Sequence, residues 1–210
     1  MSLRTYLFKK RKNIIFRLHD KELLYKIDDA LNEAGIFYWL DYGTLLGAIR
    51  EHDFIKHDED IDIGVKYEDY KKVPDAMAAK GIKMFAQSFV NGQKGVIQRY
   101  IYKGITFDVY FYEIFEEENL MICYSFYRVE QTKRERDSVV GVEKFEVPYY
   151  GFTKYSFKER EFNIPGEVDT YLKVLYGENY MTPDPSFSVD SINYITHYSI
   201  EEKQGTKYSY

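Results

Sequence analysis

Apolar residues recur at helical spacing in the first third of the chain. Leu23, Ile27 and Leu31 lie four residues apart, which places them on one face of a helix. Asp20 is a suitable N-cap before this run, and Gly35 is a suitable C-terminal stop. We therefore predict a helix from Asp20 to Gly35.

Shorter segments with glycine or proline near their ends predict three further helices, over residues 44–50, 67–81 and 164–180. Pro74 either starts or kinks the second of them, because proline tolerates only the first turn of a helix. Pro165 lies near the start of the third, where its missing N–H costs nothing.

Alternating apolar and polar positions, rich in β-branched and aromatic residues, predict strands between these helices. The predicted strands are residues 36–43, 58–65, 83–89, 95–103 and 105–115. The last two are joined by a tight Lys103-Gly104 turn. Helices and strands in this order predict an α+β, or mixed α/β, fold with one central sheet flanked by helices.

The length of 210 residues suits a single domain, and we expect residues 1–210 to form one. Residues 1–19 are expected to be a basic lead-in to the first helix, and residues 188–210 a polar, partly mobile tail. The 22 tyrosines and 15 phenylalanines are typical of an aromatic-rich β core. An aromatic platform for a sugar or a base is the alternative interpretation.

Charge and cysteine content narrow the classes of function. The net charge of -5 gives no global positive field that would recruit nucleic acid. A single cysteine, Cys123, excludes an intramolecular disulfide framework and suits a reducing compartment. The apolar run NIIFRL is too short for a signal peptide or a membrane span. We expect a cytoplasmic protein, with weak contact between the basic N-terminus and the inner membrane face as an added possibility.

The strand over residues 58–65 carries an unusual set of charges. Because side chains alternate along a strand, Asp58, Asp60 and Asp62 share one face, while Ile61 and Ile63 occupy the other. Two bare carboxylates about 7 Å apart repel by about 2.5 kcal/mol at an effective dielectric constant near 20. A divalent cation would relieve this repulsion, and so would full exposure to water. An EF-hand loop is excluded because its sixth position, which requires glycine, is Ile63.

Two further features favour a cation site. Asp108 lies in an apolar strand, where an unpaired charge is costly. Gly43 and Thr44 lie between a predicted strand and a short helix, where backbone amides can bind a phosphate. Together with the acidic strand, these residues predict a site for a divalent metal and a phosphate.

Residues 38–65, YWLDYGTLLGAIREHDFIKHDEDIDIGV, closely resemble the signature of the LicD and fukutin family, which belongs to the nucleotidyltransferase-fold superfamily. The segment ITFDVYFYE resembles the family's third-carboxylate strand. The residues Ile164 to Pro185 resemble its closing helix motif. The resemblance covers most of Tyr38 to Pro185 and implies a nucleotidyltransferase-like fold with a C-terminal helical addition.

The resemblance also implies an activity. Family members transfer a phospho-alcohol, such as phosphocholine or ribitol phosphate, from a CDP-linked donor to a glycan or glycolipid hydroxyl. By this resemblance Asp60 and Asp62 hold Mg²⁺, or Mn²⁺ in its place, and Asp108 completes the metal site. Asp108 is also a candidate base for the acceptor's proton.

The same resemblance implies the substrate contacts. Gly43 and Thr44 would contact a donor phosphate, and Arg50 is a candidate phosphate clamp because its guanidinium binds two oxygens. Arg99 could reach a phosphate from a neighbouring strand, or form a surface salt bridge. His57 could stack on a base or sugar, or face solvent.

Three alternatives remain open from the sequence. A true nucleotidyltransferase would use the same carboxylates to transfer a nucleoside monophosphate. A non-catalytic module would keep the fold and bind a nucleotide or cation. A structural domain with a solvated acidic strand would bind neither.

Overall fold

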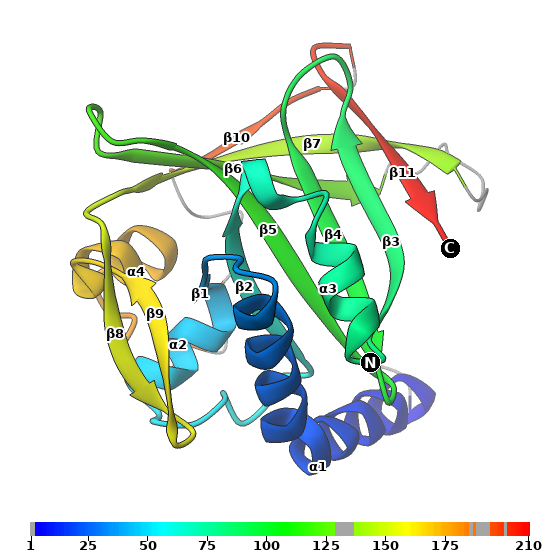
Figure 1. Cartoon of the computed structure of the whole chain (residues 1–210), viewed down its shortest axis with the longest axis vertical. Helices are drawn as coiled ribbons and strands as arrows, with labels where there is room; N and C mark the ends of the chain where they lie inside the picture. Colours follow the sequence, from blue (N-terminus) through cyan, green and yellow to red (C-terminus); the bar gives the residue numbers. More distant parts are fainter. Residues whose placement is uncertain (1–2, 129–136, 185–186, 188–193, 200) are drawn as a thin grey trace.

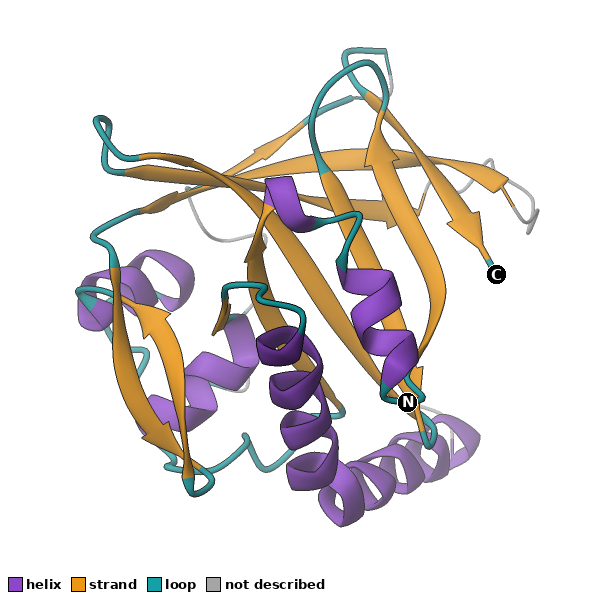
Figure 2. Ribbon diagram, viewed as in Figure 1, coloured by secondary structure: helices purple, strands orange, loops and turns teal. Residues whose placement is uncertain are grey.

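In a computed structural model of the chain, helices flank one large sheet (Figures 1 and 2). The structure describes residues 3–128, 137–184, 187, 194–199 and 201–210. The helices are α1 (Leu3–Glu33), α2 (Tyr42–Arg50), α3 (Val73–Ala79), α4 (Val168–Tyr176) and the 3₁₀ helix η1 (Tyr67–Asp69). The strands are β1 (Tyr38–Leu40), β2 (Asp60–Lys66), β3 (Lys83–Val90), β4 (Val96–Tyr102), β5 (Ile105–Phe115), β6 (Leu120–Arg128), β7 (Asp137–Pro148), β8 (Phe152–Phe157), β9 (Arg160–Pro165), β10 (Ile195–His197) and β11 (Gln204–Ser209).

The central sheet is mixed. Its strands follow the order β1-β2-β5-β4-β3-β11-β7-β10, and β6 joins β5 to β7. β2 and β5 run parallel, whereas β1 with β2 and β4 with β5 are antiparallel. A parallel pair needs a long crossover, which here contains α3, β3 and β4. The predicted mixed α/β fold with a central mixed sheet is confirmed.

The pairing also closes on itself. β5 pairs with β4 along its first half and with β6 at its end, and the pairing continues from β4 through β3, β11 and β7 back to β6. Residues 204–209, predicted to be part of a polar tail, are the strand that joins β3 to β7. Hydrogen bonds on both edges hold this strand, so its polar side chains do not prevent its formation. Residues 188–193 of the predicted tail lie outside the described residues.

Helix α1 begins at Leu3, well before the predicted start at Asp20. The basic lead-in is therefore the first half of the helix, because lysine and arginine are good helix formers. Asp20 lies in the middle of the helix, and its Oδ2 is 3.9 Å from Arg17 Nη1. Phe16 is fully buried, and its ring packs edge-on against Phe54 at 5.2 Å.

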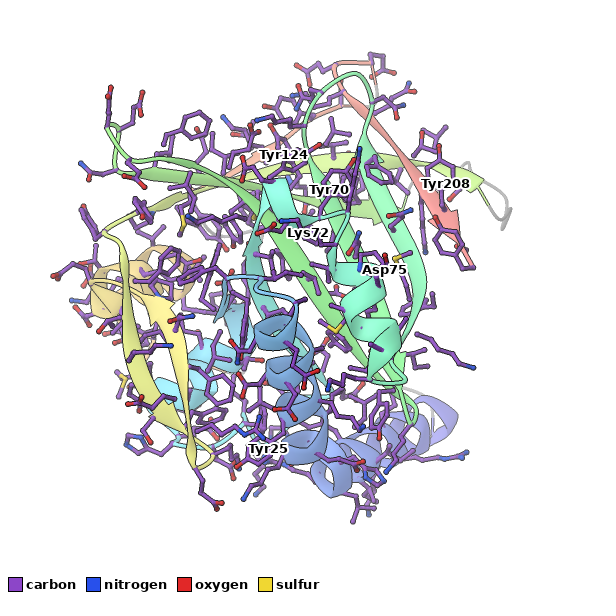
Figure 3. The ribbon with its side chains drawn as sticks, in the orientation of Figure 1. Tyr25, Tyr70, Lys72, Asp75, Tyr124 and Tyr208 are labelled. Carbon is purple, nitrogen blue, oxygen red and sulfur yellow. The ribbon has the colours of Figure 1, made fainter. Side chains whose placement is uncertain are left out.

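Helices α1 and α3 lie against one face of the sheet (Figure 1). Gln98 of β4 points to this face, because its side-chain amide donates to the carbonyl of Tyr70 at 3.0 Å. Tyr70 lies just before α3 and is labelled in Figure 3. Strand alternation then turns Arg99 to the opposite face. That opposite face carries the acidic side chains of β2 and β5.

Candidate active site

The first turn of α2 is held by a buried carboxylate. Asp41 is the N-cap and is fully buried, and its Oδ1 accepts from the backbone N–H of Tyr42 at 2.9 Å. The hydroxyls of Tyr112 and Tyr171 also donate to it, at 2.6 and 2.8 Å. Burial raises the pKa of Asp41 to about 6, although both tyrosine hydrogen bonds oppose the rise. The helix begins two residues before its predicted start at Thr44, and Asp41 was not predicted as its N-cap, although aspartate is a preferred N-cap residue.

The same turn fixes the backbone of Asp62. Thr44 is 1% exposed, and its Oγ1 accepts from the Asp62 N–H at 2.9 Å. The Asp41 N–H donates to the Asp62 carbonyl at 3.2 Å. A Cβ on Gly43 would lie 3.4 Å from Oδ2 of both Asp58 and Asp62. Two carboxylate oxygens thus converge beside the Cα of Gly43.

Sheet register brings the predicted carboxylates together. Asp62 lies directly opposite Asp108 in the parallel β2–β5 pair, and Asp60 lies opposite Thr106. Arg99 lies opposite Asp108 on β4, and its Nε is 3.4 Å from Asp108 Oδ2. The three predicted metal ligands therefore share one face, and Arg99 partly balances the charge of one of them.

Burial and mutual repulsion disfavour the ionised forms of these carboxylates. Burial raises the pKa of Asp62 well above its usual range, and the charges of Asp60, Asp108 and Asp58 raise it further. Burial raises the pKa of Asp108 to about 6 against the opposing charge of Arg99. Burial, aided by the charge of Asp60, raises the pKa of Asp58 to about 7. A bound cation would relieve this concentration of negative charge.

The carboxylates of the site have the right chemistry for a hard divalent cation, but their present arrangement does not form a complete ligand set. Within the described parts of the chain, no three His, Cys, Asp or Glu side chains are grouped closely enough to hold a metal ion. Carboxylate oxygens are nevertheless the ligands that Mg²⁺ prefers. Asp58 and Asp62 each place one such oxygen beside Gly43, 3.4 Å from the position its Cβ would take. The residues therefore fit a divalent cation in their chemistry, and side-chain movement is needed to complete its ligand set.

A pocket of about 900 Å³ opens beside the carboxylates. Asp58 belongs both to its lining and to the acidic cluster of Asp58, Asp60, Asp62 and Asp108. Gly43 also lines the pocket and lies beside Asp58 and Asp62, so the pocket and the cluster are continuous. The other lining residues come from α2, the loop before β2, the last residue of α4 and the segment after it: Leu46, Arg50, Ile55, His57, Tyr176, Asn179, Tyr180, Thr182, Pro183, Asp184 and Phe187. The aromatic members of this wall were not predicted as site residues, although they fall within or beside the closing motif.

The predicted substrate-binding residues divide into two groups. Gly43, Arg50 and the exposed His57 line the pocket. The Thr44 hydroxyl accepts a hydrogen bond from the backbone of β2, and Arg99 forms an ion pair with Asp108. Whether any of them contacts a substrate stays a prediction.

Arg50 is the best-placed cation of the pocket. Its side chain is 11% exposed. Its Nη1 donates to the Tyr180 carbonyl at 3.2 Å, and its Nη2 donates to Glu51 Oε1 at 2.8 Å. Its Nε is buried without a hydrogen-bond partner. An unsatisfied buried donor is costly, and an anionic oxygen of a ligand would satisfy it.

A family model described as the LicD/FKTN/FKRP nucleotidyltransferase domain matches residues 35–167. The match includes α2, β2, β5 and therefore every carboxylate of the acidic cluster. The predicted family resemblance is confirmed.

Curated relatives match shorter segments. The human ribitol-5-phosphate transferase FKTN is 40% identical over 58 residues, which are 28% of this chain and 13% of that protein. The mouse ribitol 5-phosphate transferase FKRP is 51% identical over 39 residues, 19% of this chain and 8% of that protein. An uncharacterised protein of Rickettsia prowazekii is 42% identical over 48 residues, 23% of this chain and 18% of that protein. The matched segments thus span less than a fifth of each of these relatives.

Among solved structures, the chain is similar to the lincosamide antibiotic adenylyltransferase LnuA bound to lincomycin. The TM-score is 0.45 and the sequence identity 16%, over 72% of this chain and 83% of that one.

Proposed function

Since the chain belongs to the LicD/FKTN/FKRP family of nucleotidyltransferase domains, we propose that it is a phospho-alcohol transferase. Its donor is a CDP-linked alcohol, such as CDP-choline or CDP-ribitol, and its acceptor is a hydroxyl of a saccharide or glycolipid. The relatives FKTN and FKRP, which are named as ribitol phosphate transferases, support this class of reaction.

One observation carries the proposal. Asp62 and Asp108 face each other across a parallel strand pair, next to a pocket large enough for a nucleotide-linked donor. A solvated acidic strand would place such carboxylates in water. Here both side chains are half-buried, and this burial raises the pKa of each. A fold keeps such costly groups together mainly at a functional site.

In this proposal Asp60, Asp62 and Asp108 hold Mg²⁺, for which Mn²⁺ can substitute. The cation, when bound, neutralises charge on the donor pyrophosphate and on the leaving group. Thr44 keeps Asp62 in place through the 2.9 Å hydrogen bond from the Asp62 N–H. Arg99 limits the charge on Asp108 through their ion pair.

The pocket binds the donor. Arg50 offers its buried Nε to a phosphate oxygen, and Gly43 allows the donor to approach Asp58 and Asp62 closely. Tyr176 and Phe187 provide ring surfaces for the cytosine base, and His57 lies at the exposed part of the lining.

The chemical step is an in-line displacement at phosphorus. The acceptor hydroxyl oxygen forms a bond to the phosphorus that bears the alcohol. The bond from that phosphorus to the bridging pyrophosphate oxygen breaks, and CMP leaves with its electron pair. The acceptor's proton passes to a carboxylate, for which Asp108 is our candidate.

The test is a thermal-shift titration of the purified chain with Mg²⁺, with CDP-choline or CDP-ribitol, and with both together. A ligand at 100 times its Kd should add about 2.7 kcal/mol to the free energy of unfolding. We expect stabilisation that needs cation and cytidine nucleotide together. It should disappear in Asp62→Asn and persist in Asp75→Asn, an exposed carboxylate on α3 at the opposite face of the sheet (Figure 3).

Product analysis then separates the two reactions that share this site. Release of CMP from a CDP-alcohol, at least about 100-fold slower in Asp62→Asn, would support phospho-alcohol transfer. A nucleotide label retained on the acceptor would show nucleotidyl transfer instead. No stabilisation by any cation and nucleotide would contradict both.

A further inference from the structure

Positive charge is concentrated at the start of the chain. The first 19 residues contain six of the 29 basic side chains and none of the 34 acidic ones. Because α1 begins at Leu3, all six of these basic residues lie on a single helix. Figure 1 shows the first turns of α1 along the lower edge of the molecule, before the later turns rise against the sheet.

One side of this helix faces outward. Lys10, Arg11, Ile14 and Leu18 are exposed, with Ile14 51% and Leu18 71% exposed. At about 100° of rotation per residue, these four positions fall within an arc of about 100°. The outward face therefore combines two cations with two large aliphatic side chains on neighbouring turns.

The flank of the same turns, beside the outward face, holds the loop that leads to the acidic strand. Asn13 Nδ2 donates to the carbonyls of Lys56 and Asp58, at 3.0 and 2.9 Å. Arg17 Nη2 donates to the Phe54 carbonyl at 3.0 Å. These contacts fix the rotation of the helix, so Ile14 and Leu18 stay directed away from the protein.

We propose that the outward face of α1, formed by Lys10, Arg11, Ile14 and Leu18, docks on a bilayer surface that contains anionic lipid. A helix with aliphatic residues beside cations is suited to lie in the plane of the interface, where the aliphatic groups enter the headgroup region. Each nearby lysine or arginine adds attraction to an anionic surface. No helix in the described part of the chain is long and apolar enough to cross a membrane.

Charge and area favour a lipid surface over a protein partner. A symmetric contact with a second copy would bring Lys10 and Arg11 against the same cations of its partner. Two aliphatic side chains also provide far less area than the roughly 800 Å² per partner of a stable protein interface. An anionic bilayer complements the charge and needs only the small apolar insertion that Ile14 and Leu18 offer.

Docking in this way would place the lipid close to the site. A helix with its side chains is about 10–12 Å across, and the loop contacts its flank, so the lipid surface and the loop before β2 would lie within about that distance of each other. This point rests on the proposed function: an acceptor carried by a lipid would be presented near Asp58. The docking itself requires neither donor nor metal.

The test is vesicle flotation of the full chain. Vesicles consist of phosphatidylcholine alone or with one-third phosphatidylglycerol, at low and at physiological ionic strength. We expect binding to anionic vesicles that weakens with salt, and little binding to neutral ones. Lys10→Glu with Arg11→Glu should lower the partition coefficient at least about tenfold. Ile14→Ser with Leu18→Ser should also lower it.

The matched control is Lys71→Glu with Lys154→Glu, which makes the same charge change at exposed sites away from α1 and should leave binding unchanged. Circular dichroism melts verify that each variant folds. If Ile14→Ser with Leu18→Ser unfolds, the vesicle binding of Lys10→Glu with Arg11→Glu alone tests the proposal. Equal binding to neutral vesicles, no binding, or an equal loss in the control would overturn the proposal. So would self-association that Ile14→Ser with Leu18→Ser abolishes in the absence of vesicle binding. Failure of vesicle binding leaves the thermal-shift result with CDP-alcohols unaffected, so the two proposals can fail separately.

Discussion

Two glycines of α2 have different neighbours. A Cβ on Gly43 would lie 3.4 Å from the carboxylate oxygens of Asp58 and Asp62. A Cβ on Gly47 would lie 2.6 Å from the backbone oxygen of Asp53, a contact that no rotamer change can relieve. The first glycine leaves space beside the candidate cation ligands, and the second lets the following loop pack against the helix.

Alanine at each glycine should therefore have opposite effects. Gly43→Ala should keep or raise the free energy of unfolding, by up to about 1 kcal/mol, because alanine favours a helix. It should also weaken stabilisation by Mg²⁺ with a CDP-alcohol, because its methyl fills the space beside both carboxylate oxygens that the donor is proposed to approach. Gly47→Ala should lower the free energy of unfolding by about 1–3 kcal/mol through overpacking. Urea unfolding and thermal shifts measure both, and an unchanged ligand response in Gly43→Ala would contradict the site.

Neutralising one carboxylate should separate stability from function. Without divalent cations, Asp62→Asn should raise the free energy of unfolding by about 1–2 kcal/mol, because it removes repulsion from neighbouring carboxylates. Activity should be lost in the same variant. Urea unfolding in EDTA measures the effect, with Asp75→Asn as the control. A marked loss of stability would indicate that Asp62 has a structural role.

Among the secondary-structure elements, α1 is tied to the β4–β5 turn by one carboxylate. Glu22 accepts from Lys103 Nζ at 2.8 and 2.9 Å and from the Tyr102 hydroxyl at 2.8 Å. The hydrogen bonds from Lys103 and Tyr102 lower the pKa of Glu22 from 4.5 to about 2. Because the folded pKa is the lower one, the ionised form stabilises the fold.

This pKa shift sets a pH window. The stabilisation by Glu22 should be fully present above about pH 4.5 and be lost as the pH falls to about 2. The difference in the free energy of unfolding between the natural chain and Glu22→Gln should therefore shrink over that range. Urea unfolding at several pH values measures it. A difference that stays constant down to pH 2 would show that the ionised form contributes nothing.

Local patterns predicted the elements that bury one face and expose the other. The alternation of Ile61 and Ile63 with acidic residues identified β2, and Gly43 marked the region of α2. The same patterns did not reveal β6 and β7 or the polar β11. These strands are paired along both edges, so backbone hydrogen bonds hold them without a clear apolar alternation.

The candidate site was predictable in composition but not in geometry. Asp60, Asp62 and Asp108 could be named from the sequence, yet the pairing of Asp62 with Asp108 depends on a register between distant strands. Asp41 contacts Tyr112 and Tyr171, which come from β5 and α4. The aromatic wall of the pocket is likewise formed by tertiary packing, which no local periodicity encodes.

At the scale of the whole molecule, the closed ring of paired strands depends on β11, which joins β3 to β7. Thr206 lies opposite Phe89 on one side and Val139 on the other. Its hydroxyl also donates to Asn91 Oδ1 at 2.9 Å. The strand has a partner along each edge, so a break in it affects both neighbours.

Proline at this position should open the sheet. Thr206→Pro removes a backbone donor from a central strand and should lower the free energy of unfolding by about 3 kcal/mol. Thr206→Val keeps the backbone donor and the β propensity and should cost about 1 kcal/mol, the value of the lost hydroxyl hydrogen bond. Urea unfolding compares the two. Equal losses would show that β11 adds little to the closure.

The place of β11 also affects how the chain folds during synthesis. Roughly 100 residues separate β3 from β11, and a ribosome adds about 5–20 residues per second. One edge of β3 is therefore synthesised about 5 to 20 seconds before its partner exists. An unpaired strand edge attracts other strands, including those of neighbouring nascent chains. Protecting that edge during translation, whether by chaperones or by a slow spacing of ribosomes, is a requirement that this order of strands imposes on the cell.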